Sequence, residues 1–295
     1  MTPSQDRVLD WGHRNLSDLP WRQSRDPWAV LVSEVMAQQT QVARVVPKWE
    51  AFIGRWPDPA ACAAAELGEV LRLWSGLGYP RRARNLHAAA IELVDRHGGT
   101  VPEDRAQLLA LPGVGPYTAD AVLAFAFGHD VGVVDTNIAR VLARHQGRAL
   151  GAKEVRALAA SLVPAGEGWW WNQTLMHLGG TLCRPRTPEC GACPLAATCR
   201  WGPRQDTAPD PARGSALVSG RQARFEGSDR QARGRLLAAV AEGPVPAGGI
   251  AAAAGLVSDS VRATMVADSL IVDGLVERDG SGNLRLPRGT RGSPS

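Results

Sequence analysis

The sequence predicts an all-α protein over roughly its first 200 residues. Apolar residues recur at helical spacing in several long stretches, including PWAVLVSEVMAQQTQVARVV (27–46) and RARNLHAAAIELVDRH (82–97). Prolines between these stretches mark the ends of the expected helices. Strand-like alternation is scarce, because VGVV (131–134) is too short to build a sheet.

The composition bounds the class of protein. The 295 residues are 44% hydrophobic, which suits about two domains with apolar cores. No run approaches the ~20 apolar residues of a membrane span, and the N-terminal MTPSQDRVLDWGHRNL lacks the order of a signal peptide. We therefore expect a cytoplasmic protein with no membrane partner. The net charge of +4 is compatible with a nucleic-acid partner but does not identify one.

A second, smaller part is expected at the C-terminal end. Residues 204–228 are rich in Pro, Gly, Arg, Asp and Ser, a composition typical of a linker. Within 229–290, three helical stretches precede GNLRLP (282–287), which can form a hairpin with the end of the third stretch. Three helices and a hairpin are typical of a winged-helix-like α/β module. A chain ending near Arg204 is then expected to fold without this module.

Four cysteines form a candidate ligand set. Cys183, Cys190, Cys193 and Cys199 fall within 17 residues at the spacing C-x6-C-x2-C-x5-C. A cytoplasmic setting argues against disulfides. Zinc usually takes two C-x2-C pairs separated by a longer loop, whereas this sequence has one such pair flanked by single cysteines. The spacing therefore favours a [4Fe–4S] cluster over zinc.

A glycine-containing turn stands out in LPGVGPYTADAV (111–122). Gly113 and Gly115 permit positive φ and close approach of another backbone. N–H groups at the start of the following helix can bind an anion. The stretch is therefore typical of a helix–hairpin–helix that grips a DNA phosphate, although an ordinary tight turn between packed helices has the same features.

Asp135 follows an apolar run and opens VVDTNIARVLAR (133–144). Taken alone, it is explained as a helix N-cap. A catalytic carboxylate is the alternative, because Asp135 lies twenty residues beyond a candidate phosphate-binding hairpin and precedes a four-cysteine loop.

Together these features resemble the endonuclease III superfamily of DNA base-excision glycosylases. Within it, the chain is similar to the A/G-specific adenine DNA glycosylase (MutY) family from about Val8 to Cys199. The matching motifs are LPWR (19–22), SEVMAQQTQV (33–42), WSGLGYPRRARNLH (74–87), LPGVGPYTA (111–119), VVDTNIARVLAR (133–144) and NQTLMHLGG (172–180). Because they are long and follow one another in order, the resemblance is specific.

The resemblance implies a helix–hairpin–helix DNA glycosylase fold. This fold combines a six-helix barrel with a helical iron–sulfur cluster domain. The segments expected here are 1–26 and 133–203 for the cluster domain, 27–132 for the barrel, 204–228 for the linker and 229–290 for the winged-helix-like module.

The resemblance also implies catalytic roles. Breaking the N-glycosidic bond of adenine needs a general acid, and an oxocarbenium-like sugar is stabilised by a carboxylate. The family assigns the acid to Glu34, which protonates adenine, and the carboxylate to Asp135, with Asn137 and Tyr117 beside it. The apolar neighbours of Glu34 would favour its protonated form. A solvent-facing helix glutamate is the alternative.

Tyr117 bears on the product of the reaction. Bifunctional relatives carry a lysine at this hairpin position, which attacks the sugar and nicks the strand. The only lysines here are Lys48 and Lys153, so this site has no amine to form a Schiff base. The expected enzyme is therefore monofunctional.

Further residues match family contacts to a duplex from which the target base is flipped out. Gln39 and Tyr79 match residues that wedge into the opened helix, although a helix-surface amide and a core tyrosine are ordinary alternatives. Trp21 and Arg22 resemble residues that line the adenine pocket. The complete set expected to bind DNA is Gly113, Gly115, Gln39, Thr40, Tyr79, Trp21 and Arg22.

The C-terminal region departs from the family, because it lacks the β-rich pattern of the Nudix-like domain that recognises 8-oxoguanine. The expected substrate is still adenine opposite 8-oxoguanine or guanine in double-stranded DNA, bound by a nucleoid-associated monomer. Three alternatives stay open: a mismatch thymine or uracil glycosylase, a bifunctional lyase, and a cluster-bearing DNA-binding regulator without catalysis.

Overall fold

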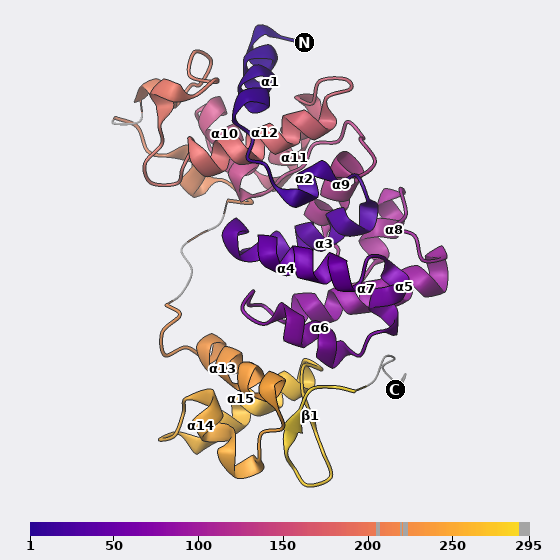
Figure 1. Cartoon of the computed structure of the whole chain (residues 1–295). Coiled ribbons are helices and arrows are strands. Elements are labelled where there is room, and N and C mark those ends of the chain that lie inside the picture. Colours follow the sequence, from indigo (N-terminus) through magenta and orange to yellow (C-terminus); the bar gives the residue numbers. More distant parts are fainter. Residues whose placement is uncertain (205–206, 219, 221–223, 289–295) are drawn as a thin grey trace. The chain divides into compact units, whose positions relative to one another are not determined.

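The computed structural model describes residues 1–204, 207–218, 220 and 224–288 (Figure 1). They form helices and one two-stranded sheet, as the predicted fold class requires. The chain divides into two compact units: a first unit of Met1–Val30 and Val114–Arg221, and a second unit of Leu31–Gly113 and Gln222–Ser295. Among the described residues, no helix is both long and apolar enough to cross a membrane.

Both chain segments of the first unit contribute helices. They are α1 (Pro3–Asn15), α2 (Pro20–Gln23), the start of α3 (Pro27–Ala37), α9 (Pro116–Phe125), α10 (Thr136–Gln146), α11 (Ala152–Ser161), α12 (Gly168–Thr181), and the short η1 (Cys190–Ala192), η2 (Gly202–Arg204) and η3 (Pro211–Gly214). Helix α12 packs against α1, α9 and α10. Val8, Ile138 and Leu178 are fully buried in the shared apolar core.

The second unit contains the rest of α3 and the helices that follow it. They are α4 (Val42–Arg55), α5 (Pro59–Ala64), α6 (Leu67–Trp74), α7 (Arg81–His97) and α8 (Arg105–Ala110). Helix α7 packs against α5 and α6. It ends at Gly98, whose φ of 60° is the left-handed conformation typical of a helix C-terminus.

The C-terminal residues of the second unit form the expected three helices and hairpin. These elements are α13 (Asp229–Glu242), η4 (Ala247–Gly249), α14 (Ile250–Ala254), α15 (Ser260–Val272), β1 (Glu277–Arg278) and β2 (Leu284–Arg285), drawn in orange and yellow in Figure 1. The three α-helices pack on one another, and β1 pairs antiparallel with β2.

These C-terminal elements also contact the helical part of the second unit. The buried Asp273 forms ion pairs with Arg81 of α7 and Arg233 of α13. The N–H of Gly68 donates to the carbonyl of Pro287 at 3.2 Å.

The segment predicted to be a linker is packed in the part that the structure describes. Asp210 caps η3 and pairs with the buried Arg144 of α10. Ala212 and Ser215 are buried, and the Ser215 hydroxyl accepts from the Leu150 N–H at 3.0 Å. Around Asp210–Ser215, the segment therefore packs against residues far away in sequence.

Candidate active site and cluster site

The glycine turn has one position that requires glycine. Gly113 has φ of 80°, and a Cβ there would lie 2.7 Å from the Cβ of Asn85. Gly115 has an ordinary φ of −96° as the N-cap of α9, with Pro116 at the first helical position. Gly113 therefore uses the positive φ that glycine permits, whereas Gly115 does not and its backbone instead opens the helix.

Asp135 is the N-cap of α10, and its carboxylate has a second partner as well. Its Oδ1 accepts from the Ile138 N–H at 2.7 Å, which is the capping bond. Its Oδ2 accepts from Nδ2 of Asn137 at 2.8 Å. The structure thus brings Asp135 and Asn137 together and holds the carboxylate in one orientation through both oxygens.

Arg140 extends this arrangement toward the cysteine loop. Its Nη2 donates to Oδ1 of Asn137 at 2.7 Å and to the Gly179 carbonyl at 2.6 Å, while its Nε donates to the Cys183 carbonyl at 2.8 Å. The residue is only 4% exposed. Sequence reasoning missed Arg140. The available signal was an arginine pair four residues apart, Arg140 and Arg144, on the buried face of a helix.

Burial controls the protonation of Asp135. Desolvation raises the pKa of its carboxyl above the ordinary value of 3.8. Hydrogen bonds from Ile138 and Asn137 and the nearby charge of Arg140 act in the opposite direction. These donors therefore favour the ionised form at a position where burial disfavours it.

Glu34 and Tyr117 lie in different units. Glu34, in α3 of the second unit, is 5% exposed, and Leu31, Val32, Val35 and Met36 around it in sequence are buried. The alternative interpretation of Glu34 as a solvent-facing helix residue is therefore wrong. Tyr117 lies in the first turn of α9 in the first unit and is half-buried.

The side chains of Trp21 and Arg22 both contact other residues of the first unit. Trp21 is 8% exposed, so most of its ring is packed. Arg22 donates from Nε to Oε1 of Gln173 at 2.8 Å and from Nη1 to the Ser17 carbonyl at 2.8 Å.

Gln39, Thr40 and Tyr79 come from two loops of the second unit. Gln39 has φ of 54° and Tyr79 has φ of 47°, which is left-handed backbone at residues that carry a Cβ. Gln39 is exposed and Tyr79 is 37% exposed, so Tyr79 is not a core tyrosine. The Thr40 hydroxyl donates to the Leu77 carbonyl at 3.1 Å, which joins the two loops.

The four cysteines of the predicted ligand set line one cavity of about 260 Å³, together with Arg144, Trp201 and Gly202. No group of three or more His, Cys, Asp or Glu among the described residues is arranged to hold a single metal ion. Four sulfur donors around one cavity can hold a metal centre with thiolate ligands.

Hydrogen-bond donors point at two of the sulfur atoms. Nη1 of Arg144 lies 3.4 Å from Sγ of Cys183, and the Gly202 N–H lies 3.3 Å from Sγ of Cys199. Such bonds stabilise thiolate ligands. Without metal, burial raises the pKa of the Cys193 thiol to about 11.

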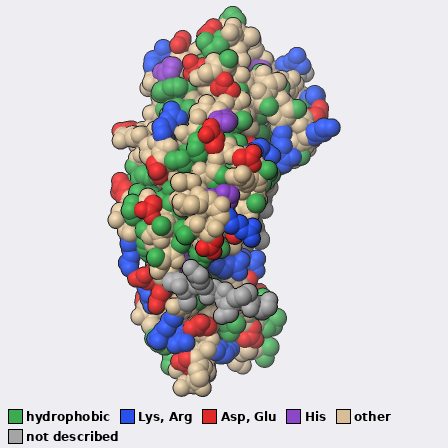
Figure 2. Space-filling model, turned by 90° about the vertical axis from the view of Figure 1, so that its right-hand side faces the viewer, with side chains coloured by type: hydrophobic (Ala, Val, Ile, Leu, Met, Phe, Trp, Pro, Cys, Tyr) green, Lys and Arg blue, Asp and Glu red, His purple; other side chains and the backbone are tan. Residues whose placement is uncertain are grey.

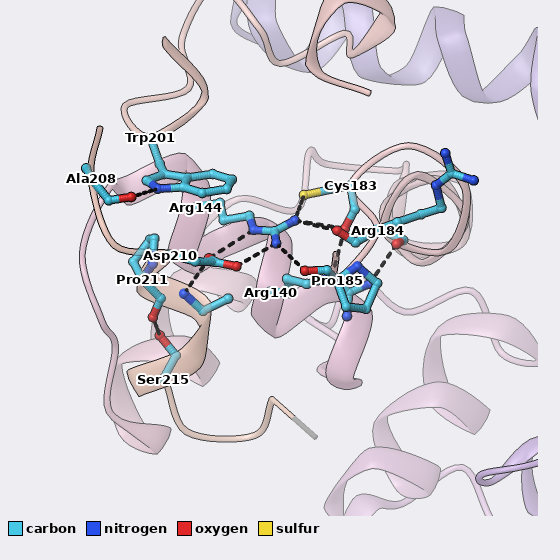
Figure 3. A network of polar contacts seen from close by, with 12 residues as sticks. Arg140, Arg144, Cys183, Arg184, Pro185, Trp201, Ala208, Asp210, Pro211 and Ser215 are labelled. Atoms are coloured by element: carbon cyan, nitrogen blue, oxygen red, sulfur yellow. Dashed lines mark hydrogen bonds and ion pairs between the residues drawn. The ribbon is translucent and has the colours of Figure 1, made fainter. Parts of the chain in front are cut away.

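Arg144 lies between the cysteine loop (183–199), at Cys183–Pro185, and the later segment that contains Asp210 (Figure 3). Its guanidinium donates to the carbonyls of Arg184 and Pro185 and to both carboxylate oxygens of Asp210. The guanidinium carbon lies 4.7 Å from the Trp201 ring centroid.

On the molecular face in Figure 2, Lys and Arg side chains are interspersed with Asp and Glu.

Comparison with known families identifies the fold and the family. The HhH-GPD superfamily of base excision DNA repair proteins matches residues 32–165. An adenine DNA glycosylase of Mycolicibacterium smegmatis is 42% identical, with 100% of each chain covered. The chain belongs to the adenine DNA glycosylase family of base excision repair enzymes. The resemblance seen in the sequence motifs is therefore confirmed.

Other adenine DNA glycosylases are similarly related to this chain. The Mycobacterium tuberculosis H37Rv protein is 42% identical over 96% of this chain and 93% of its own, and the human protein is 41% identical over 68% of this chain and 39% of its own. Among solved structures, a thermostable thymine-DNA glycosylase matches with a TM-score of 0.64 at 30% identity, covering 68% of this chain and 95% of its own. A non-covalent endonuclease III–DNA complex matches with a TM-score of 0.60 at 29% identity, covering 70% of this chain and 98% of its own.

Proposed function

We propose that this adenine DNA glycosylase family member removes adenine mispaired with 8-oxoguanine or guanine from double-stranded DNA. Glu34 protonates the adenine ring, which makes it a better leaving group. Asp135 stabilises the positive charge that develops on the sugar. Water then completes the substitution and leaves an abasic site.

The hydrogen bonding of Asp135 carries this proposal. A helix cap needs one carboxylate oxygen, yet both oxygens of Asp135 are held, one by Ile138 and one by Asn137. Asn137 is held in turn by Arg140. This arrangement fixes a negative charge in place before the reaction, which is the condition for electrostatic stabilisation of a cationic transition state.

We propose a monofunctional reaction. Tyr117 lies in the first turn of α9, directly after the hairpin, and the only lysines are Lys48 and Lys153. Strand cleavage through a Schiff base needs an amine at the sugar. The residue at position 117 therefore supports simple hydrolysis without strand cleavage.

We further propose that Cys183, Cys190, Cys193 and Cys199 hold a [4Fe–4S] cluster. When bound, the cluster supplies a rigid core for the loop rather than a reacting group. Arg144 and the Gly202 N–H contribute hydrogen bonds to the sulfur atoms. Arg140 joins the Cys183 carbonyl to Asn137, so this loop also helps to orient the residues around Asp135.

A mismatch thymine glycosylase is the second candidate, favoured by the similarity to the thermostable thymine-DNA glycosylase. A buried acid is less useful to that reaction, because expelling a pyrimidine anion needs less protonation. Glu34 is buried, which favours adenine.

The test is excision from duplexes containing A·8-oxoG, A·G, T·G and U·G, each analysed with and without alkali. We expect free adenine from the first two and an intact abasic strand that breaks only in alkali. Release of thymine or uracil without adenine would favour the second candidate. A borohydride-trapped enzyme–DNA adduct would contradict the monofunctional reaction.

A further inference from the structure

The guanidinium of Arg82 joins two loops of the second unit. Arg82 lies in the first turn of α7. Its Nη1 lies within 2.7–2.9 Å of the carbonyl oxygens of Val35, Met36 and Gln38. The first two of these carbonyls belong to the last turn of α3, where helix carbonyls lack partners in the helix. Arg82 therefore caps α3 from a different helix.

The other terminal nitrogen of Arg82 binds the second loop. Nη2 donates to Oγ1 of Thr40 at 3.0 Å and to the carbonyls of Leu77 and Gly78 at 3.2 and 3.0 Å. Burial lowers the pKa of the guanidinium to about 10, so it remains charged at neutral pH. One cation thus holds acceptors from residues 35–40 and 77–78 together.

The two loops carry left-handed residues directly beside these contacts. Gln39 follows Gln38, and Tyr79 follows Gly78, so each comes immediately after a carbonyl that Arg82 binds. The guanidinium carbon also lies 5.5 Å from the Tyr79 ring centroid. A left-handed backbone is unfavourable for residues with a Cβ and persists only where the surroundings hold it.

We propose that Arg82 is a positioning residue for base extrusion, which presents Gln39 and Tyr79 to DNA by fixing both loops. This inference rests on the proposed function and on the expectation, from the family resemblance, that these two side chains wedge into the opened duplex. Arginine suits the role because its planar fork reaches several acceptors at once, whereas lysine offers one compact charge. Arg82 itself need not touch the DNA.

The experiment compares full-length wild type with Arg82→Lys and Arg82→Met. The matched control is Arg96→Gln on the same helix, because the Arg96 side chain is 73% exposed and pairs only with Glu92 among the ion pairs described. Single-turnover adenine release is measured from a mispaired duplex and from a duplex in which the adenine is already unpaired in a bubble. Fluorescence of 2-aminopurine at the target position reports extrusion separately from chemistry.

On the mispaired duplex, both Arg82 variants should release adenine at least about tenfold more slowly, with a smaller fluorescence increase, because extrusion must overcome stacking and pairing. On the bubble, the loss should be less than about threefold, because the base is already free. Arg96→Gln should match wild type on both. A general structural role would slow both substrates equally, and that result would overturn the inference.

Two further comparisons keep the outcome clear. If the Arg82 variants do not fold, Thr40→Val removes the hydroxyl that donates to the Leu77 carbonyl and accepts from Arg82, and it should slow the mispaired substrate more than the bubble. An equal effect of Thr40→Val on both substrates would then overturn the inference. If wild type releases no adenine from either substrate, the proposed function fails rather than the role of Arg82.

Discussion

Arg144 and Asp210 form a buried ion pair 66 residues apart in sequence, with Nη2 2.6 Å from Oδ2. The side chains are 2% and 12% exposed, respectively. Asp210 therefore compensates a charge that lies against the cysteine loop. Removing one partner of such a pair leaves the other uncompensated, which costs far more than an exposed pair contributes.

We expect Asp210→Asn to lower the free energy of unfolding by ~3–5 kcal/mol, the usual cost of breaking a buried pair. The measurement is chemical denaturation, with iron content determined in parallel. The control is Glu154→Gln, whose pair with Arg148 is 51–58% exposed, so its loss should change the free energy of unfolding much less. Equal effects of the two substitutions would contradict the role given to Asp210.

The same pair changes the expectation for C-terminal truncation. A chain ending at Arg204 loses Asp210 and the buried Ala212, whereas a chain ending at Gly220 keeps both. We therefore expect the chain ending at Gly220 to retain iron and the chain ending at Arg204 to lose it. Iron analysis of both purified proteins is the measurement, and equal iron retention would show that the 207–218 segment is dispensable.

Asp135→Asn separates catalysis from helix capping. Asparagine caps a helix about as well as aspartate but carries no negative charge. Single-turnover adenine release should fall at least ~100-fold, the scale of electrostatic stabilisation, while the thermal midpoint stays close to wild type. Asp104→Asn is the control, because Asp104 caps α8 through a 2.9 Å bond to the Gln107 N–H. Near wild-type release by Asp135→Asn would leave capping as the only role of this residue.

The rate should also show an acid limb set by Asp135. Catalysis needs the ionised carboxylate, and burial raises its pKa above 3.8, so activity is lost as pH falls through that raised value. Asn137→Ala removes a hydrogen bond that lowers this pKa. The acid limb of the single-turnover rate should therefore move to higher pH in the variant. An unchanged or lower limb would show that Asn137 does not stabilise the ionised form.

The cysteine cavity predicts the metal content. Protein purified without oxygen should contain about four iron atoms per chain, since a [4Fe–4S] cluster takes four thiolates. Chelation of the iron should lower the thermal midpoint, because folding of the loop is coupled to metal binding. Protein containing one zinc and no iron would contradict the cluster.

Local sequence signals predicted much of the fold and part of the site. Helical periodicity predicted the long helices, and the spacing of the cysteines predicted a shared ligand set that the structure places around one cavity. The cap at Asp135 was also readable, because its bond reaches only three residues along the chain. Such features depend on residue types at short separations, which a sequence displays directly.

The tertiary structure alone decided which distant groups hold the site in place. Arg82 binds carbonyls 44–47 residues away, and any residue type offers a backbone carbonyl, so no sequence pattern marks these partners. Asp210 lies in a stretch with the composition of a linker, and nothing in that composition indicates its buried pairing with Arg144. The physical reason is the same in both cases: a buried cation must be compensated, but the group that compensates it is selected by folding.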